Sequence, residues 1–352
     1  MIIGWIPALD LPWAKSFMSQ FPWESVEMTR RETFPVTHCQ STRWFSARRG
    51  RVAFAAAVTL AALTAGGPQA LADCSALQQR ARDLQQAGDT GGMKVVYEQA
   101  LLDSSCGNDY RSQLGRAVVR GIERAVVQGV PAGRPLASFE GELADSQRFA
   151  SSWRIHAWMG DIARERKDYA KAAASYQEAL TVIEDEVATP KAPEPAVIEQ
   201  VFRQAEESRL LADRFVAPPT TRSGTPSGLA SVNLRGFKPT KVAVPIEFAY
   251  DSTEFTPKGR AAADDLAATL RAQSPATITL VGHTDSRGAR DYNMALSLNR
   301  ANAVAAHLRR GGYTGTIQTI GLGPTEPMVL DDPTRYAAEQ IHQINRRVEL
   351  RR

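Results

Sequence analysis

The sequence has few cysteines, almost no excess charge and only one long apolar run among its 352 residues. That run, at 52–65, has 14 residues, fewer than the ~20 that a membrane-spanning helix needs. It contains no acidic residue, which argues against a role in ion conduction. His283 has no second His or Cys at a metal-ligand spacing, and no nucleophile is paired with a base and an orienting group. We therefore expect no metal site, no cofactor and no enzyme activity.

The net charge of +4 comes mostly from the first 72 residues. They hold seven Lys or Arg and four Asp or Glu, which leaves 35 basic against 34 acidic residues in 73–352. The helix expected at 291–310 has only Arg300, Arg309 and Arg310 as fully charged bases. Nucleic-acid binding needs a basic face, and neither the charge balance nor this helix supplies one. Nucleic acid is therefore not an expected partner.

Residues 1–72 are typical of a leader that ends in a secretory signal peptide. Four arginines at 43–51 precede the apolar run, and Ala70-Leu71-Ala72 follows it as a small-residue cleavage site. We expect cleavage after Ala72, a mature chain that begins at Asp73, and export to the periplasm. A signal anchor is the alternative interpretation of the apolar run. The 42 residues before the arginines exceed an ordinary basic region, so either the start codon is assigned too early or the leader is unusually long.

Cys74 and Cys106 are the two cysteines of the expected mature chain, since Cys39 falls in the leader. An even count in an oxidising compartment favours a disulfide between them. The competing interpretation is lipidation of Cys74, because Leu71-Ala72-Asp73-Cys74 resembles a lipobox. The residue before a lipidated cysteine is normally small, and Asp73 departs from that rule. Cleavage after Ala72 is therefore the preferred interpretation.

Residues 73–216 have the composition and spacing of an α-helical domain. A helix pair at about 146–184 resembles a tetratricopeptide repeat (TPR) through Gly160, Ala172, Tyr176 and Ala179. Small residues let two helices approach closely, and the aromatic ring fills the gap beside them. An ordinary helical bundle is the alternative. The next segment, 217–241, is rich in Pro and Gly and predicts a flexible linker.

Residues 242–352 show strand and helix patterns in the order strand, helix, strand, helix, strand, strand. The expected strands are 242–248, 276–281, 316–321 and 345–351, and the expected helices are 257–272 and 291–310. This order predicts an α/β sandwich in which one sheet carries helices on one side. The fold class of the whole chain is therefore α+β and multidomain, with a TPR-like helical domain, a linker and this sandwich.

The stretch VGHTDSRGARDYNMALSLNR, at 281–300, carries the candidate binding site. It predicts the end of a strand, a loop bracketed by glycines, and the first turns of a helix. Asp285 lies in the loop, while Asn293, Ser297 and Arg300 form a polar stripe at i, i+4 and i+7 of the helix. A carboxylate and a guanidinium that face one cleft would hold a zwitterion, Asp285 by its ammonium and Arg300 by its carboxylate.

The series GHTDSRG, YN, LS, RA and NRRVEL resembles the OmpA-like peptidoglycan-binding domain family over roughly 242–352. The resemblance implies that the ligand is the diaminopimelate residue of the peptidoglycan stem peptide. It implies that Asp285 and Arg300 hold the free zwitterionic end of that residue, and that Arg347 lies at the rim of the same cleft. The segment 328–344 departs from the family, because it lacks the Gly-Arg that often precedes NRR. The resemblance therefore gives no expectation for the loop that borders the cleft.

Together these features predict a non-catalytic cell-envelope protein of a Gram-negative bacterium, associated with the cell wall and outer membrane. Its partners would be peptidoglycan and an envelope protein that engages the helical domain. Two alternatives are a targeting or regulatory subunit of a cell-wall enzyme and an outer-membrane lipoprotein of the same family. The predicted peptidoglycan-binding residues are Asp285, Arg300, Asn293, Ser297 and Arg347.

Overall fold

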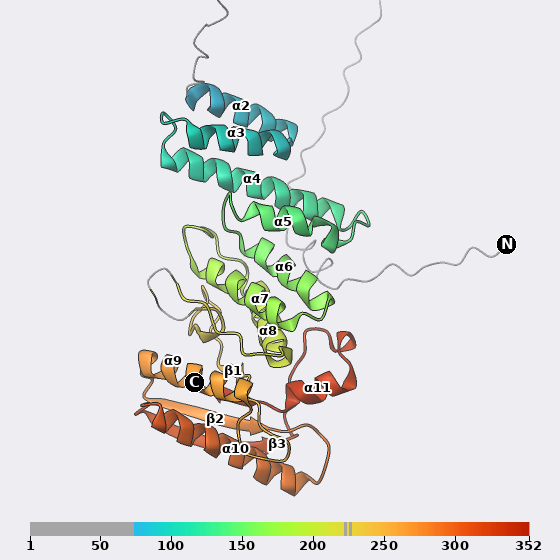
Figure 1. Cartoon of the computed structure of the whole chain (residues 1–352), viewed down its shortest axis with the longest axis vertical. Coiled ribbons are helices and arrows are strands. Elements are labelled where there is room, and N and C mark those ends of the chain that lie inside the picture. Colours follow the sequence, from blue (N-terminus) through green and yellow to red (C-terminus); the bar gives the residue numbers. More distant parts are fainter. Residues whose placement is uncertain (1–73, 222–223, 225–226, 352) are drawn as a thin grey trace, which may run out of the picture. The chain divides into compact units, whose positions relative to one another are not determined.

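The computed structural model describes residues 74–221, 224 and 227–351 (Figure 1). The expectations for the leader, the signal peptide and its cleavage concern residues that lie outside these ranges. Within them, no helix is both long enough and apolar enough to cross a bilayer. A helical region comes first and an α/β domain with a four-stranded sheet follows, as the sequence predicts.

The helical region follows the predicted pattern of helices from residue 74 to residue 211. Asp89 accepts a hydrogen bond from the N–H of Gly92 at 2.8 Å, and Asp168 accepts one from the N–H of Lys171 at 3.0 Å. These two carboxylates cap the helices that follow them. The elements are α2 (Cys74–Ala87), α3 (Thr90–Leu102), α4 (Asn108–Gly129), η1 (Leu136–Phe139), α5 (Glu140–Ser146), α6 (Trp153–Glu165), α7 (Tyr169–Glu184) and α8 (Pro195–Leu211).

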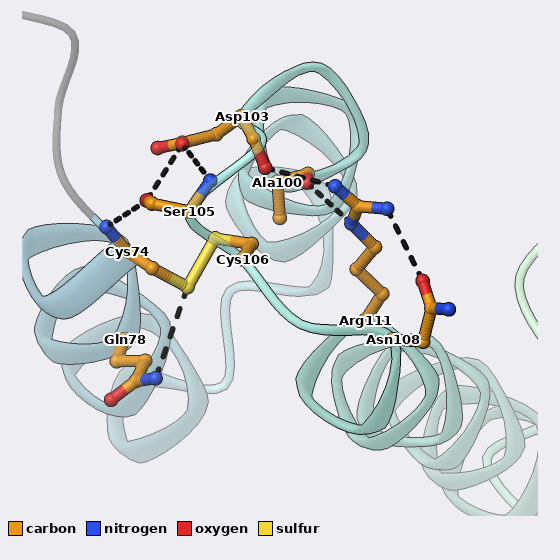
Figure 2. The surroundings of a disulfide bond; sticks show 8 residues. All are labelled: Cys74, Gln78, Ala100, Asp103, Ser105, Cys106, Asn108 and Arg111. Carbon is orange, nitrogen blue, oxygen red and sulfur yellow. Dashed lines mark hydrogen bonds between the residues drawn. A yellow bond between two sulfur atoms is a disulfide. The ribbon is translucent and has the colours of Figure 1, made fainter.

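A disulfide joins Cys74, the first residue of α2, to Cys106 just before α4, which confirms the predicted pairing (Figure 2). The N–H of Cys74 also donates to the Ser105 hydroxyl at 3.1 Å, and Arg111 donates to carbonyl oxygens at the end of α3. The cysteines are 32 positions apart, and a cross-link of that span stabilises by about 3 to 4 kcal/mol in the chain-entropy account. A sulfur engaged in this bond cannot also carry a thioether-linked lipid.

The helices α6 and α7 meet at Gly160 and Tyr176. A Cβ atom on Gly160 would lie 2.6 Å from the Tyr176 ring, so only glycine allows this approach. Ala172 and Ala179 are fully buried in the same cluster, and the Tyr176 hydroxyl donates to Asp161 at 2.8 Å. The small and aromatic residues therefore pack as expected for a close helix pair, while its tetratricopeptide character stays a prediction.

The sheet has the strand order β1-β4-β2-β3. Strand β4 pairs antiparallel with both β1 and β2, and β3 pairs parallel with β2. Two of the helices, α9 and α10, fall where the sequence predicts them, while α11 occupies the segment that departs from the family pattern. The elements are β1 (Lys241–Val244), α9 (Pro257–Gln273), β2 (Thr277–His283), α10 (Arg290–Arg310), β3 (Thr316–Gly323), η3 (Pro333–Arg335), α11 (Ala338–Asn345) and β4 (Val348–Arg351), with η2 (Gly228–Ala230) ahead of β1.

One face of this sheet is covered by helices, and the opposite face is covered at its β1 end. On one face, α9 and α10 enclose a core with alternate residues of the central strands, which include Ile278, Leu280, Val348 and Leu350. On the opposite face, Ala243 of β1 packs with Leu210 and Leu211 of α8 and with Tyr336 and Ile344. The sequence predicts helices on one side only, so the covering of the β1 end of the second face by α8 and the α11 segment is a correction, while Gln318 and Ile320 of β3 stay exposed.

Helix α8 also covers the free edge of the sheet. The N–H of Ala243 in the edge strand β1 donates to the carboxyl group of Glu206 at 2.6 Å. Every residue of α8 from Gln204 to Leu211 is buried, including Glu206 and Glu207. The last turns of this helix are therefore enclosed by the two regions that they connect.

Residues 227–241, predicted as part of a flexible linker, pack against the helical region instead. Leu229 and Leu234 are buried in one cluster with Tyr176 and Phe202, and Phe237 packs edge-on against the Phe202 ring at 5.5 Å. The hydroxyl of Ser227 is also buried against Thr181 and Glu184 of α7. The Pro and Gly content suggests a solvated chain, but burial of Leu229 and Leu234 and the ring contact of Phe237 hold the segment against the helices.

Candidate functional site

A pocket of about 660 Å³ opens beside the carboxyl end of β2 and the first turns of α10. Its walls come from the loop after β2, the first half of α10, the segment 245–251, and α11. The pocket lining therefore brings together parts of the chain that lie far apart in sequence. The polar and charged lining residues are Glu247, Asp251, Lys258, Thr284, Asp285, Arg287, Tyr292, Asn293, Arg300, Glu339, Gln343 and Arg346, with Leu210 and Phe248 among the apolar ones.

Two glycines allow the loop after β2 to take its path. A Cβ atom on Gly282 would lie 2.0 Å from the carbonyl oxygen of Ser297, so glycine is needed where β2 passes α10. Gly288 has φ of +93°, a left-handed conformation that glycine adopts without steric cost. Thr284 fixes the start of the loop, because its N–H donates to the Gly323 carbonyl at 3.0 Å. The predicted bracketing of the loop by glycines is therefore confirmed.

Asp285 is a buried carboxylate that already holds two arginines. Its Oδ1 accepts from the N–H of Arg287 at 3.0 Å, and its Oδ2 accepts from the guanidinium groups of Arg287 and Arg346, both at 2.8 Å. Burial alone would raise the pKa of Asp285, but these hydrogen bonds outweigh it and lower the pKa to about 2. Asp285 is therefore an anion at any physiological pH.

Arg300 faces the same pocket, and the two Nη nitrogens of its guanidinium form an open fork. Its Nε donates to the Ser252 carbonyl at 3.1 Å, and its guanidinium lies 5.0 Å from the centre of the Phe248 ring. Among the described residues, nothing accepts a hydrogen bond from its two Nη nitrogens. Burial lowers the pKa of Arg300, and repulsion from Arg346 lowers it further. A carboxylate that reached this fork would offset both effects by favouring the charged guanidinium, and it would bind in the paired geometry that guanidinium favours.

Glu339, near the start of α11, completes a ring of alternating charges with Asp285. Arg287 donates to Glu339 at 3.0 Å and Arg346 donates to it at 3.1 Å, while both arginines also hold Asp285. An ammonium group that approaches Asp285 must share this carboxylate with the two arginines or displace them. Sequence reasoning missed Arg287, Glu339 and Arg346, because their roles depend on the position of α11.

Asp285, Arg300 and Asn293 come together as predicted, and the side chain of Asn293 ties α10 to the loop by donating to the Arg287 carbonyl at 2.8 Å. Ser297 does not line the pocket. It is fully buried, donates to the Met294 carbonyl and accepts from the N–H of Gly323, so it fastens α10 to β3.

The structure also places Arg347 outside the pocket, which corrects its expected position at the rim. Arg347 is 3% exposed, and its guanidinium pairs with Glu349 at 2.5 Å, on the strand that follows. The preceding residue, Arg346, takes the place beside Asp285. His283 is also buried at the end of β2, and burial lowers its pKa. Within the described part of the chain, no three His, Cys, Asp or Glu residues are grouped so as to hold a metal ion.

The arrangement can bind a small group that carries both charges. Asp285 offers a permanent anion, and Arg300 offers two unused donors in the same pocket. Lys258 also lines the pocket, where it donates to the carbonyl oxygens of Leu210 at 3.0 Å and Ala212 at 2.6 Å. The chemistry of this pocket is therefore suited to recognition of a zwitterion.

Comparison with known proteins identifies relatives of this part of the chain. The model of the OmpA family matches residues 247–340. The peptidoglycan-associated lipoprotein of Pseudomonas aeruginosa is 33% identical over 135 residues, which are 38% of this chain and 77% of that protein. The peptidoglycan-binding protein ArfA of Mycobacterium tuberculosis (strain ATCC 25618 / H37Rv) is 31% identical over 135 residues, 38% of this chain and 39% of that protein.

Among solved structures, the peptidoglycan-associated lipoprotein from Burkholderia pseudomallei is 29% identical over 31% of this chain and 87% of that chain. The TM-score of this alignment is 0.26. The relationship therefore rests on sequence, through the family model and a relative that is aligned over more than three quarters of its length. By these matches, the chain belongs to the OmpA family.

Proposed function

We propose that this protein binds peptidoglycan non-covalently through the diaminopimelate residue of the stem peptide. The free end of that residue carries one ammonium and one carboxylate. Asp285 would receive the ammonium, and the open fork of Arg300 would receive the carboxylate in a bidentate pair. The observation that carries the proposal is the pocket itself, which brings a permanent carboxylate and an incompletely bonded guanidinium together from a loop and a helix.

We further propose a role for the whole protein. It acts without catalysis in the periplasm, at the cell wall and outer membrane, and its TPR-like helical region engages an envelope protein. The names of the relatives support an association with peptidoglycan. The disulfide at Cys74 disfavours the alternative of an outer-membrane lipoprotein anchored through that sulfur.

Co-sedimentation with purified sacculi tests this function. The protein should pellet with sacculi that contain diaminopimelate and should remain mostly in the supernatant with sacculi that contain lysine at the same position. Lysine has the ammonium but lacks the second carboxylate, so the Arg300 fork stays empty and an affinity loss of about 2 kcal/mol or more is expected. Equal pelleting with both kinds of sacculi would refute recognition of diaminopimelate.

A further inference from the structure

One wall of the pocket is attached to the helical region more than to the sheet. The segment 328–346, which includes α11, contributes Glu339, Gln343 and Arg346 to the pocket lining. Arg346 is the residue of this wall that holds Asp285, at 2.8 Å. Any shift of the segment would therefore move a charge that contacts the proposed ligand site.

The attachment centres on Glu207 of α8, which is fully buried. One carboxylate oxygen accepts from the N–H of Asp331 at 2.6 Å, and the other accepts from the Tyr336 hydroxyl at 2.6 Å. Gln204, one turn earlier, donates to the Asp331 side chain at 3.0 Å. A buried carboxylate that holds two donors fixes both of them, because either donor would be left without a partner if the segment moved.

Two further contacts join α11 itself to the helical region. Gln340 donates to the hydroxyl of Tyr169, the first residue of α7, at 2.7 Å, and Gln343 donates to the carbonyl of Leu210 at the end of α8 at 3.3 Å. Leu210 and Leu211 also pack against Tyr336 and Ile344 in one hydrophobic cluster. Leu210 in addition lines the pocket, so the helical region reaches the site directly as well as through α11.

We propose that Glu207, together with Tyr336 and the Tyr169–Gln340 pair, positions the α11 wall, so that the helical region sets the affinity of the pocket for its peptide ligand. The inference rests on the proposed function and assigns these four as positioning residues, since none of them needs to touch the ligand. It makes the helical region part of the binding site, in addition to any role in engaging another protein.

The test measures the affinity of the full mature chain for the tripeptide L-Ala-γ-D-Glu-meso-diaminopimelate by calorimetry, alongside the melting temperature. Tyr336→Phe deletes one hydroxyl and should weaken binding about five- to tenfold, within the range seen for residues that couple to a site. Tyr169→Phe, at a half-buried position that leaves the core intact, should weaken binding about two- to threefold. Glu207→Gln combined with Tyr336→Phe should lose little more affinity than the more affected single variant, because both remove the same link.

Tyr313→Phe is the matched control. The Tyr313 hydroxyl is bonded to the Pro275 carbonyl at 2.7 Å in the same domain, but it lies beyond the far end of α10 from the pocket. This variant should lose similar stability and keep the affinity of the wild type within about twofold.

The outcomes separate the inference from the function on which it rests. If Asp285→Ala abolishes binding while Tyr336→Phe and Tyr169→Phe bind like the wild type, the positioning role is refuted and the proposed function stands. If Tyr336→Phe and Tyr313→Phe lose affinity equally, the loss reflects general destabilisation and the positioning role is again refuted. If the wild type does not bind the tripeptide, both proposals fall.

Discussion

Asp285→Ala and Arg300→Ala should each abolish co-sedimentation with diaminopimelate sacculi while leaving the circular dichroism spectrum unchanged. Removal of either residue leaves one charge of the bound zwitterion desolvated without a partner, at a cost of about 2–5 kcal/mol. Arg300→Lys should recover only part of the binding, because a point charge cannot form the paired fork. Arg310→Ala, at an exposed position on the same helix, is the control and should pellet like the wild type.

Two results would count against the pairing of the zwitterion with Asp285 and Arg300. One is pelleting of both alanine variants at the wild-type level. The other is full recovery in Arg300→Lys, which would mean that the bidentate geometry has no role. Because Asp285 also holds Arg287 and Arg346, Asp285→Asn should be measured as well. It keeps the size and an acceptor oxygen of the side chain but lacks the charge, and should bind as poorly as Asp285→Ala.

The second large effect concerns stability and centres on Glu206. Burial raises the pKa of this carboxyl to about 8, against the opposing hydrogen bond from Ala243, and the nearby Glu349 and Glu207 raise it further while Arg347 lowers it. The folded protein therefore holds this proton more tightly than the unfolded chain. The stability that results is complete below the ordinary Glu pKa of 4.5 and is lost as the pH rises through about 8.

Because the folded state holds the Glu206 proton more tightly, the unfolding free energy of the wild type should fall by roughly 3 kcal/mol as the pH rises from 5 to 8. Glu206→Gln removes the titration and keeps an acceptor for the Ala243 N–H, so this variant should lack that share of the pH dependence. Urea unfolding of both proteins across this range measures the difference. A stability difference between the two proteins that does not change with pH would contradict the buried, protonated state of Glu206.

The elements of the α/β domain are predictable from the sequence because their patterns are local. Strand alternation, helix spacing and the two glycines of the loop after β2 locate Asp285, Asn293 and Arg300 correctly. The prediction that Ser297 faces the pocket is wrong for a geometric reason. At 3.6 residues per turn it lies about 40° around the helix from Asn293, toward the sheet, whereas Arg300 lies about 20° to the other side.

Arg346 lies beside Asp285 in place of the predicted Arg347, and this difference has a similar cause. Successive residues of an extended segment point to opposite sides, so which arginine of the pair faces the pocket depends on where β4 begins. That boundary is set by pairing with β1 and β2, and the sequence of the strand alone does not contain it. Glu339 was missed for a stronger reason, since α11 is placed by contacts with α7 and α8 more than 120 residues earlier.

The packed segment 227–241 shows where composition misleads. Its Pro and Gly residues predict a solvated chain, but Leu229, Leu234 and Phe237 are spaced so that each reaches the cluster between α7 and α8. The same limitation applies to α8. Its sequence reads as a charged helix, yet Glu206 and Glu207 are buried because the sheet edge and the α11 segment supply donors for them.

The most direct measurement is a crystal structure of the protein with bound L-Ala-γ-D-Glu-meso-diaminopimelate. The free ammonium of the diaminopimelate side chain should lie within hydrogen-bond distance of the Asp285 carboxylate, with Arg287 or Arg346 shifted to admit it. The carboxylate beside that ammonium should accept two hydrogen bonds from the Nη nitrogens of Arg300. A tripeptide bound elsewhere, or bound in this pocket with Asp285 still held by both arginines and the Arg300 fork empty, would contradict the account.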